Sequence, residues 1–427
     1  MLDIGILRRD PAGAAAALER RGLDGASATV AAIVERDRER RAALGRANEL
    51  RALRNRVSRE IGEAKRRGGD AAAEVARMRE VGGEIAELDA VVAAADAWIA
   101  RKLAVVPNLP GPGVPGGGEE SNVIVRSRGT APVFPFEPRP HWELGKALGI
   151  LDLEAGARVS GSGFFVLKGR GAALQRGLID WMIDLHSTDH GYDELRVPYL
   201  VREEAMAGTG QLPKFAEESY VTRRDGLWLI PTAEVPVTNV HRGEILRGDT
   251  LPRKYVAYSP CFRREAGAAG KDTRGMLRVH QFDKVELVRF ERPETAPAAL
   301  EELTGEAARV LELLGLTYRV VLLAAEDLGF SASLTYDIEV WAPGVGKWLE
   351  VSSCSTFADY QARRANIRFR RSRGSGTEFV HTLNGSALAL PRLMVALLET
   401  FQRPDGSVRL PSALGAVLGF GEIGPGP

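Results

Sequence analysis

Hydrophobic residues between positions 28 and 102 recur at the spacing expected of paired α-helices, and no proline interrupts this stretch. After Gly68-Gly69, apolar positions follow one another every seven residues, and a second series is offset from the first by three. These positions are Met78, Ile85, Val92 and Ile99, with Val81, Leu88 and Ala95 in the offset series. A looser stripe precedes the glycines at Leu50, Leu53, Val57 and Ile61. The pattern predicts an antiparallel coiled-coil arm over about 28–102, turning at Gly68-Gly69, with helices roughly 50 Å long.

The pattern changes after the arm. Nine of the twelve residues from Pro107 to Gly118 are proline or glycine, so this segment is predicted to be a linker. Downstream, short apolar stretches predict a strand over Gly163–Leu167 and a helix with Leu174, Leu178, Trp181 and Leu185 on one face. The strands predicted over 254–264 and 278–290 follow each other with no helix between them. We therefore predict an α+β protein in which a helical domain (1–106) and a linker (107–118) precede an antiparallel sheet with flanking helices (119–427).

Charge is distributed unevenly over an almost neutral chain. The 427 residues carry a net charge of +1, and 44% are hydrophobic and 26% charged, as in an ordinary globular protein. From Arg36 to Arg67, however, twelve basic residues face five acidic ones, which gives +7 here and about −6 elsewhere. Such a stripe is typical either of a solvated coiled-coil face or of a surface that binds a phosphate backbone.

Several classes of site are excluded. Two cysteines, Cys261 and Cys354, cannot form a disulfide framework, and the six histidines lack metal-ligand spacing, so we expect no zinc. Gly267–Asp272 resembles a phosphate-binding loop but has the wrong glycine spacing, and Asp272 replaces the required Ser or Thr. Without an apolar run of about 18 residues or a signal peptide, the protein is predicted to be cytoplasmic, with no membrane association.

Residues 261–288 carry the most informative chemistry. This block is predicted to be a β-hairpin with a long, Gly-rich, basic connection. Residues two apart share one face of a strand, so Arg263 and Glu265 point the same way, as do Arg278, Phe282 and Glu286 on the return strand. Arginines, an aromatic plate and carboxylates are the groups that ATP and an amino acid would need. The alternative is a surface ladder of ion pairs with Phe282 in the core, which leaves the Gly-rich connection unexplained.

This block and several other strings resemble bacterial-type seryl-tRNA synthetases, which are class II aminoacyl-tRNA synthetases. The resemblance covers essentially the whole chain. The other matching strings are Thr232-Ala233-Glu234, Gly208–Phe215, Glu350–Ser355, Gln361–Arg364 and His381–Ser386 followed by Arg392.

The resemblance implies a role for each matching residue. It implies catalytic roles for Arg263, Glu350 and Arg392. It implies ATP binding by Arg263, Arg264, Glu265, Arg278, Val279, Phe282, Glu350, Val351, Ser352, Ser353 and Arg392. It implies L-serine binding by Thr232, Ala233, Glu234, Arg263, Glu286, Asn384 and Ser386, and Mg²⁺ binding by Glu350 and Ser353. Arg264 stands where serine is common, Leu334 where a basic residue is frequent, and Pro391 where glycine is frequent.

The implied activity is a serine–tRNA ligase that forms seryl-adenylate and loads tRNA(Ser), and also tRNA(Sec), with the basic arm binding the tRNA. The resemblance also implies a homodimer through the region Gly191–Val201, which includes Pro198. Two alternatives remain open. One is a paralogue that resists an analogue of seryl-adenylate or uses another acceptor. The other is an inactive RNA-binding scaffold, which would be expected to have lost Arg263, Glu286, Glu350 or Arg392.

Overall fold

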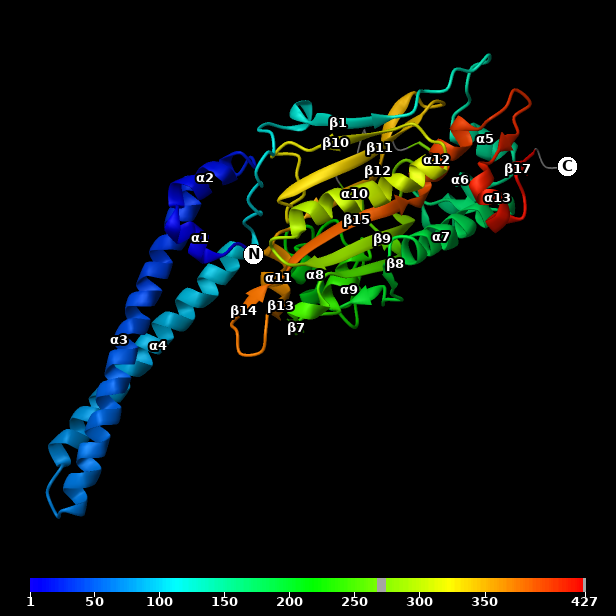
Figure 1. Cartoon of the computed structure of the whole chain (residues 1–427). Coiled ribbons are helices and arrows are strands. Elements are labelled where there is room, and N and C mark those ends of the chain that lie inside the picture. Colours follow the sequence, from blue (N-terminus) through cyan, green and yellow to red (C-terminus); the bar gives the residue numbers. More distant parts are fainter. Residues whose placement is uncertain (267–273, 425–427) are drawn as a thin grey trace. The chain divides into compact units, whose positions relative to one another are not determined.

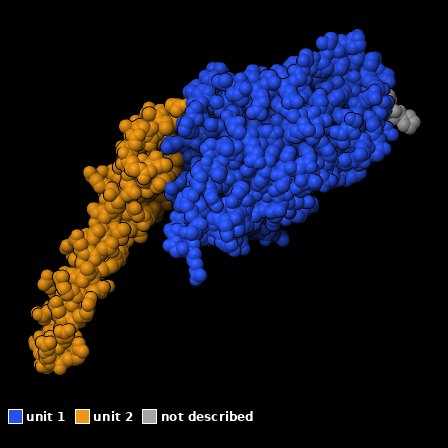
Figure 2. Space-filling view, in the orientation of Figure 1, with its two compact units in different colours: residues 1, 107–427 blue, residues 2–106 orange. Residues whose placement is uncertain are grey.

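The computed structural model describes residues 1–266 and 274–424. The segment Gly267–Asp272, and with it most of the predicted Gly-rich connection, lies outside the described residues. The chain divides into two compact units, residues 2–106 and residues 107–427 together with Met1 (Figure 2). Among the described residues, no helix has the length and apolar character needed to cross a bilayer.

Two long helices make up most of the first unit (Figure 1). Met78, Val81 and Ile85 are buried against Leu50, as their heptad spacing predicts, and this packing holds the two helices together. The chain turns between them at Gly68-Gly69, so the predicted helical hairpin is confirmed. The helices of this unit are α1 (Ile4–Arg9), α2 (Pro11–Glu19), α3 (Ala26–Arg66) and α4 (Ala72–Ala104).

An eight-stranded sheet forms the centre of the second unit, in the order β1-β10-β11-β12-β15-β9-β8-β4. Every neighbouring pair is antiparallel except β4 and β8, which confirms the predicted α+β class with an antiparallel sheet. These strands are β1 (Val123–Arg128), β4 (Asp193–Glu194), β8 (Arg253–Phe262), β9 (Gln281–Glu291), β10 (Tyr318–Leu322), β11 (Leu334–Ala342), β12 (Lys347–Thr356) and β15 (His381–Ala389).

Helices cover one face of this sheet and bury its largest hydrophobic core. Leu174, Leu303 and Leu393, from three of these helices, pack against Val285 and Leu287 of β9. The helices of the unit are α5 (His141–Ala147), α6 (Leu153–Ser160), α7 (Arg170–Thr188), α8 (Glu203–Thr209), α9 (Glu234–Asn239), α10 (Ala296–Leu313), α11 (Tyr360–Ala365), α12 (Leu390–Thr400) and α13 (Ser412–Leu418), with short 3₁₀ helices at Glu119–Ser121 and Gly248–Thr250.

The opposite face of the sheet is divided between a second core and a cavity. Val288 and Phe290 of β9 pack with Ala233 and Val237 near α9 and with Ala362 of α11. Short strands outside the main sheet complete the unit. They are β2 (Leu151–Asp152), β3 (Val166–Leu167), β5 (Leu200–Val201), β6 (Trp228–Leu229), β7 (Ile245–Arg247), β13 (Arg368–Arg370), β14 (Thr377–Phe379), β16 (Val408–Arg409) and β17 (Glu422–Ile423).

Two strand predictions need correction. The strand expected over Gly163–Leu167 is only β3, Val166–Leu167, because Gly163 has a φ of 81° that an extended strand does not allow. The strand expected over 278–290 begins at Gln281, so Arg278 lies before the strand instead of within it. The Pro/Gly segment 107–118 is irregular and belongs to the second unit, within which the Asn108 amide donates to the carbonyl oxygens of Ser331 and Phe357.

Candidate active site

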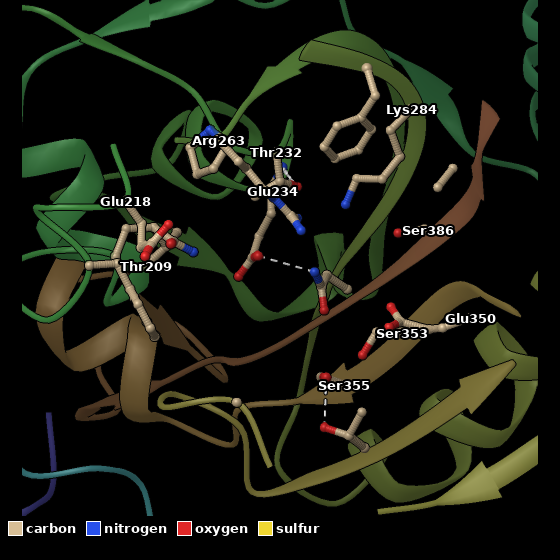
Figure 3. Close-up of a pocket in the computed structure, with 18 of the residues that line it drawn as sticks. Thr209, Glu218, Thr232, Glu234, Arg263, Lys284, Glu350, Ser353, Ser355 and Ser386 are labelled. Carbon is tan, nitrogen blue, oxygen red and sulfur yellow. Dashed lines mark hydrogen bonds between the residues drawn. The ribbon is translucent and has the colours of Figure 1, made fainter. Parts of the chain in front are cut away.

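A cavity of about 550 Å³ opens on the sheet face opposite α7, α10 and α12. Its floor consists of β9, β12 and β15, and its walls come from the segments just after β8 and just before β9 and from the loops around Thr209 and Phe330. Figure 3 shows polar side chains from these elements pointing into one space. The residues involved lie between positions 209 and 392, so the cavity exists only in the folded chain.

Strand alternation explains how β9 and β15 present polar side chains to the cavity. Residues two apart share one face of a strand, so Phe282 and Lys284 line the cavity, Glu286 lies buried on the same face of the strand, and Val285 and Leu287 face the helices. On β15, Asn384 and Ser386 face the cavity in the same way. In each strand, one alternating set of residues builds the core while the other builds the site.

A β-bulge brings Glu350 and Ser353 of β12 to the same face of the sheet. Residues three apart point to opposite faces of a regular strand, but the pairing with β11 shifts register between Ile338 and Glu339. Glu350 lies opposite Glu339 and Ser352 lies opposite Ile338, so one extra residue separates the two pairs. Both Glu350 and Ser353 consequently line the cavity.

Two buried carboxylates share a hydrogen-bond donor at the centre of the site. The Asn384 amide donates to a carboxylate oxygen of Glu234 and to one of Glu286, at 3.1 Å in each case. The Thr232 hydroxyl donates to the other Glu286 oxygen at 3.0 Å, and Lys284 forms an ion pair with Glu286. Every carboxylate oxygen of Glu286 is therefore satisfied by a donor in the wall of the cavity.

The environment of Glu234 favours its neutral form. Burial, and next the nearby charge of Glu286, raise the pKa of Glu234 from 4.5 to about 7. The Gln361 amide, which donates to Glu234 at 2.5 Å, partly opposes this effect. Gln361 is itself oriented by the Thr382 hydroxyl, which donates to its carbonyl oxygen at 2.8 Å.

Arginines and an aromatic ring gather at the other end of the cavity. The Arg263 guanidinium lies 5.1 Å from the centre of the Phe282 ring, and Arg278 pairs with Glu265 at 2.8 Å. Arg392 donates to the Glu350 carbonyl oxygen at 2.8 Å. Positive charge next to an exposed aromatic face suits a ligand with phosphates and a planar base.

The structure brings most of the predicted residues to the wall of one cavity. They are Thr232, Glu234, Arg263, Glu265, Arg278, Val279, Phe282, Glu350, Val351, Ser353, Asn384, Ser386 and Arg392. Glu286 lies just beneath this wall. Their individual roles remain predictions.

Three predicted residues have side chains outside the cavity. Ala233 is fully buried in the second core, and the Ser352 hydroxyl donates to the Ser386 carbonyl oxygen at 2.6 Å. Arg264 is exposed and donates to the Glu217 carbonyl oxygen at 3.1 Å. A side chain in these positions can act on a ligand only through a neighbour.

Other residues that contribute to the site are not predicted from the sequence. Lys284 could have been found, because it lies between Phe282 and Glu286 at the two-residue spacing of a strand face. Gln361 and the segment from Thr209 to Phe215 belong to strings that carried the resemblance. No local pattern indicated that residues of this segment would line the cavity or that Gln361 would donate to Glu234.

The donor set around Glu350 fits Mg²⁺ better than a metal held by protein ligands alone. No group of three or more His, Cys, Asp or Glu in the described residues is arranged to hold a metal ion. Glu350 and the Ser353 hydroxyl offer oxygen ligands in the cavity, and Asp337, paired opposite Ser353, has a buried carboxylate oxygen without a hydrogen-bond partner. Mg²⁺ prefers such sparse oxygen ligands together with substrate phosphates.

Two protein families match this chain. Residues 218–401, which contain most of the cavity, match the tRNA synthetase class II core domain (G, H, P, S and T). Residues 1–110, which contain the helical hairpin, match the seryl-tRNA synthetase N-terminal domain.

Whole-chain relatives agree with these matches. The serine–tRNA ligase of Roseiflexus sp. (strain RS-1) is 52% identical over 99% of both chains, and that of Gemmatimonas aurantiaca is 53% identical over 90% of both. Among solved structures, Pyrococcus horikoshii seryl-tRNA synthetase complexed with ATP superposes with a TM-score of 0.95 at 38% identity over the full length of both chains. The cytoplasmic enzyme of Naegleria fowleri, in complex with AMP, gives 0.89 at 29% identity and covers 100% of this chain and 99% of its own.

Proposed function

The chain belongs to the seryl-tRNA synthetase family and is a serine–tRNA ligase, and we propose that the cavity joins L-serine to ATP before transfer to tRNA. The observation that supports this proposal best is the pair of buried carboxylates, Glu234 and Glu286, beside the arginine and aromatic ring of Arg263 and Phe282. An amino acid needs carboxylates for its ammonium group. ATP needs cations for its phosphates and a flat surface for its base.

In this proposal, the first step uses no protein nucleophile. The serine carboxylate attacks the α-phosphorus in line, a new P–O bond forms, and pyrophosphate departs with the electrons of the broken bond. Arg263 stabilises the charge that develops at the α-phosphate, and Arg278 and Arg392 lie where they can neutralise the leaving group. Mg²⁺, held by Glu350 and Ser353, would neutralise further phosphate charge. Rate enhancement then comes from positioning and electrostatics.

We propose that Glu286 determines the specificity of the site for serine over alanine. Its carboxylate, with donors on both oxygens, can accept a hydrogen bond from the serine hydroxyl only in a fixed direction. Alanine would leave that acceptor without its partner, and a buried polar site of this kind can reject such an analogue by a factor on the order of 10⁴.

The test is serine-dependent ATP–pyrophosphate exchange, with alanine, threonine and glycine as controls. Glu286→Ala should lower kcat/KM for serine roughly 10- to 100-fold, because a hydrogen bond to a charged group is lost. Glu286→Gln preserves the shape of the side chain and should show the same direction of change if the fold is intact. Absence of exchange in folded wild-type protein, with every amino acid tried, would refute the proposal.

The arm is the proposed tRNA-binding surface, and its charges differ along its length. From Arg36 to Arg51, each arginine of α3 pairs with an acidic side chain. The pairs are Arg36–Glu39, Arg38–Glu35, Arg40–Asp37, Arg40–Asp96, Arg41–Asp37, Arg46–Glu49, Arg46–Glu84 and Arg51–Asp89. Nearer the turn, Arg54, Arg56 and Arg59 are exposed and have no acidic partner within residues 1–266 and 274–424. Their charge is therefore free for phosphates of tRNA(Ser) or tRNA(Sec).

We also propose a homodimer and a cytoplasmic location. β4, within the predicted dimer region Gly191–Val201, is the last strand on its side of the sheet, and no strand of the described residues pairs with its outer edge. Sedimentation at micromolar concentration would reveal a monomer if this proposal is wrong. Cys261 and Cys354 are unpaired, as expected in a reducing compartment.

A further inference from the structure

A basic surface lies on the small sheet β14-β13-β7, outside the main sheet (Figure 1). β13 pairs with β7 in parallel and with β14 in antiparallel orientation. Phe369 and Leu246 point into the second core, so the alternate residues of these strands lie on the opposite face of the small sheet. We call this side the basic face. Its residues are Ile245, Arg247, Arg368, Arg370, Thr377 and Phe379, of which Phe379 also touches the second core.

Like charges lie opposite one another on the basic face. Arg370 of β13 is the register partner of Arg247 of β7. Arg247 pairs with Asp249, which accepts from its Nε atom at 3.0 Å. Arg370, and Arg373 in the turn after β13, are exposed and have no acidic partner among the described residues. Because like charges on opposite residues destabilise a sheet, these two arginines do not serve the fold, and their charge is available to an external anion.

The neighbouring Arg371 fixes the turn on which these charges lie. Its guanidinium donates to both carboxylate oxygens of Glu294, at 2.6 and 3.0 Å, and to both of Glu378, at 2.6 and 3.0 Å. Arg371 is thus neutralised by two acids and ties the β13–β14 turn to the segment before α10. Arg370 and Arg373, on either side of it, are held in place without being neutralised themselves.

The aromatic ring of the basic face is already covered by arginines. The guanidinium of Arg363 lies 4.6 Å from the centre of the Phe379 ring, and that of Arg368 lies 4.8 Å from it. A site that reads nucleic-acid bases needs an open aromatic face or hydrogen bonds to base edges. The basic face instead presents Arg368 and Arg370 about 6–7 Å apart along one strand, which suits a row of phosphates.

Helix α11 separates the basic face from the cavity. On one side of this helix, the Gln361 amide donates to Glu234 at 2.5 Å and to the Thr209 carbonyl oxygen at 3.4 Å. Arg363, which follows about 200° further around the helix, lies over Phe379 on the other side. Since a helix is about 10 Å across, the basic face lies close to the site at which serine is activated and is separate from it.

We propose that the basic face binds the phosphate backbone of the tRNA as a second contact, separate from the arm, an inference that rests on the proposed function. The tRNA is the polyanion that the enzyme must hold while its end reaches the cavity, and a contact beside α11 lies near that end. Arg370 and Arg373 donate to phosphate oxygens, and Arg368 adds positive charge beside them. Because the basic face offers no group that reads a base, the contact orients the tRNA without depending on its sequence.

The test removes the two unpaired charges with Arg370→Gln and Arg373→Gln in one variant. The matched control combines Arg158→Gln and Arg409→Gln, which removes the same charge from exposed positions on α6 and β16. The first variant should bind tRNA roughly 3- to 20-fold more weakly, and the slope of log Kd against log salt should fall by about one for each phosphate contact removed. The control should bind tRNA like the wild type, and serine-dependent ATP–pyrophosphate exchange should be unchanged in both.

A tethered probe locates the contact directly. Cys261 and Cys354 are both buried, so a cysteine added at an exposed position can be labelled selectively. Ser372→Cys places an iron–EDTA probe on the β13–β14 turn, and Ser412→Cys places the same probe on α13 as a control. The probe at position 372 should cleave bound tRNA over a few consecutive nucleotides, and much more strongly than the probe at position 412.

Three results would overturn the inference. The first is unchanged affinity and salt dependence in the variant that lacks Arg370 and Arg373. The second is an equal loss in the control variant, which would mean that only net charge matters, and the third is a lack of tRNA cleavage from position 372. Wild-type protein without serine-dependent exchange would refute the proposed function instead, so the two failures can be told apart.

Discussion

Glu234 shows how the environment of a single residue controls its charge. Its carboxylate is buried, accepts hydrogen bonds from Gln361 and Asn384, and lies close to a second carboxylate, Glu286. Its raised pKa of about 7 means that the native protein keeps a proton on this group over a pH range in which the unfolded chain has released it.

The sign of the effect on stability follows from this difference. Between pH 4.5 and about 7, only native Glu234 is protonated, so a rise in pH favours the unfolded chain, and the free energy of unfolding falls by about 3 kcal/mol in total. Glu234→Gln removes this contribution. In the absence of ligands, the variant should lose less stability than the wild type between pH 5 and pH 8, as measured by the urea midpoint.

The comparison between the two proteins isolates one carboxyl. Burial also raises the pKa of Asp283 and of Asp337, so the wild-type slope contains several contributions of the same sign. These contributions cancel when the variant is subtracted from the wild type. Parallel pH profiles of the two proteins would contradict the assignment.

The residues of the hairpin show where sequence reasoning works and where it stops. Phe282 and Glu286 were predicted from strand alternation, and both are where the alternation places them. Arg278 was assigned to the same strand face, but it lies ahead of β9 and reaches the cavity through irregular backbone. Strand alternation predicts the face of the sheet to which a side chain points only within the strand. Where the strand ends depends on tertiary contacts.

At the scale of elements, the bulge in β12 could not have been read from the sequence. Glu350 and Ser353 were grouped by resemblance, although their spacing places them on opposite faces of a regular strand. The extra residue is defined by the pairing with Ile338 and Glu339, which lie on another strand. The sequence of β12 alone therefore does not predict the register of its pairing with β11.

Close packing beneath β15 gives a second prediction. A Cβ atom at Gly385, between Asn384 and Ser386, would lie 2.3 Å from Leu303 Cδ2 and 2.9 Å from Cys354 Sγ. Both neighbours are fully buried and have little room to move. Gly385→Ala should therefore lower the free energy of unfolding by about 1–3 kcal/mol, seen as a lower melting temperature.

Gly305 is a control position, because a side chain can be added there without a steric clash. It lies inside α10, and an added Cβ atom would meet no atom within 4 Å. Gly305→Ala should stabilise the protein by up to about 1 kcal/mol because alanine favours the helix. If Gly385→Ala proved as stable as wild type, β15 would have more freedom to shift than its packing indicates.

At the scale of the whole molecule, the hydrophobic and polar pattern of the sequence predicts the helices and strands better than the cavity that they form together. The helical hairpin and the antiparallel sheet follow from periodicities that act within some tens of residues. The cavity joins Thr209, Phe282, Phe330, Glu350 and Arg392, which are separated by long stretches of chain. Only the motif strings linked some of these positions beforehand, and Phe330 belonged to none of them.

The uneven pairing of arginines along the arm predicts which substitutions weaken tRNA binding. Replacing Arg54, Arg56 and Arg59 together with glutamine should weaken tRNA binding and lower the dependence of log Kd on log salt by about one for each phosphate contact removed. Filter binding between 50 and 300 mM salt would measure both effects. Serine-dependent exchange, which needs no tRNA, should be unaffected.

A matched variant distinguishes position from net charge. Arg38→Gln with Arg46→Gln also removes positive charge from α3, but both arginines already pair with glutamates. This variant should change the salt dependence much less for each charge removed. Equal effects from the two variants would mean that the arm attracts RNA only through its overall charge.

The Thr209 carbonyl oxygen has a consequence for the evolution of this site. It connects the amide next to Glu234 with the hydroxyl of Ser331, yet it belongs to the backbone and is present whatever residue occupies position 209. A saturation library should therefore tolerate small replacements at this central position, while Gln361, at the other end of one bond, should tolerate few. A position whose backbone makes an essential contact can therefore still vary in its side chain.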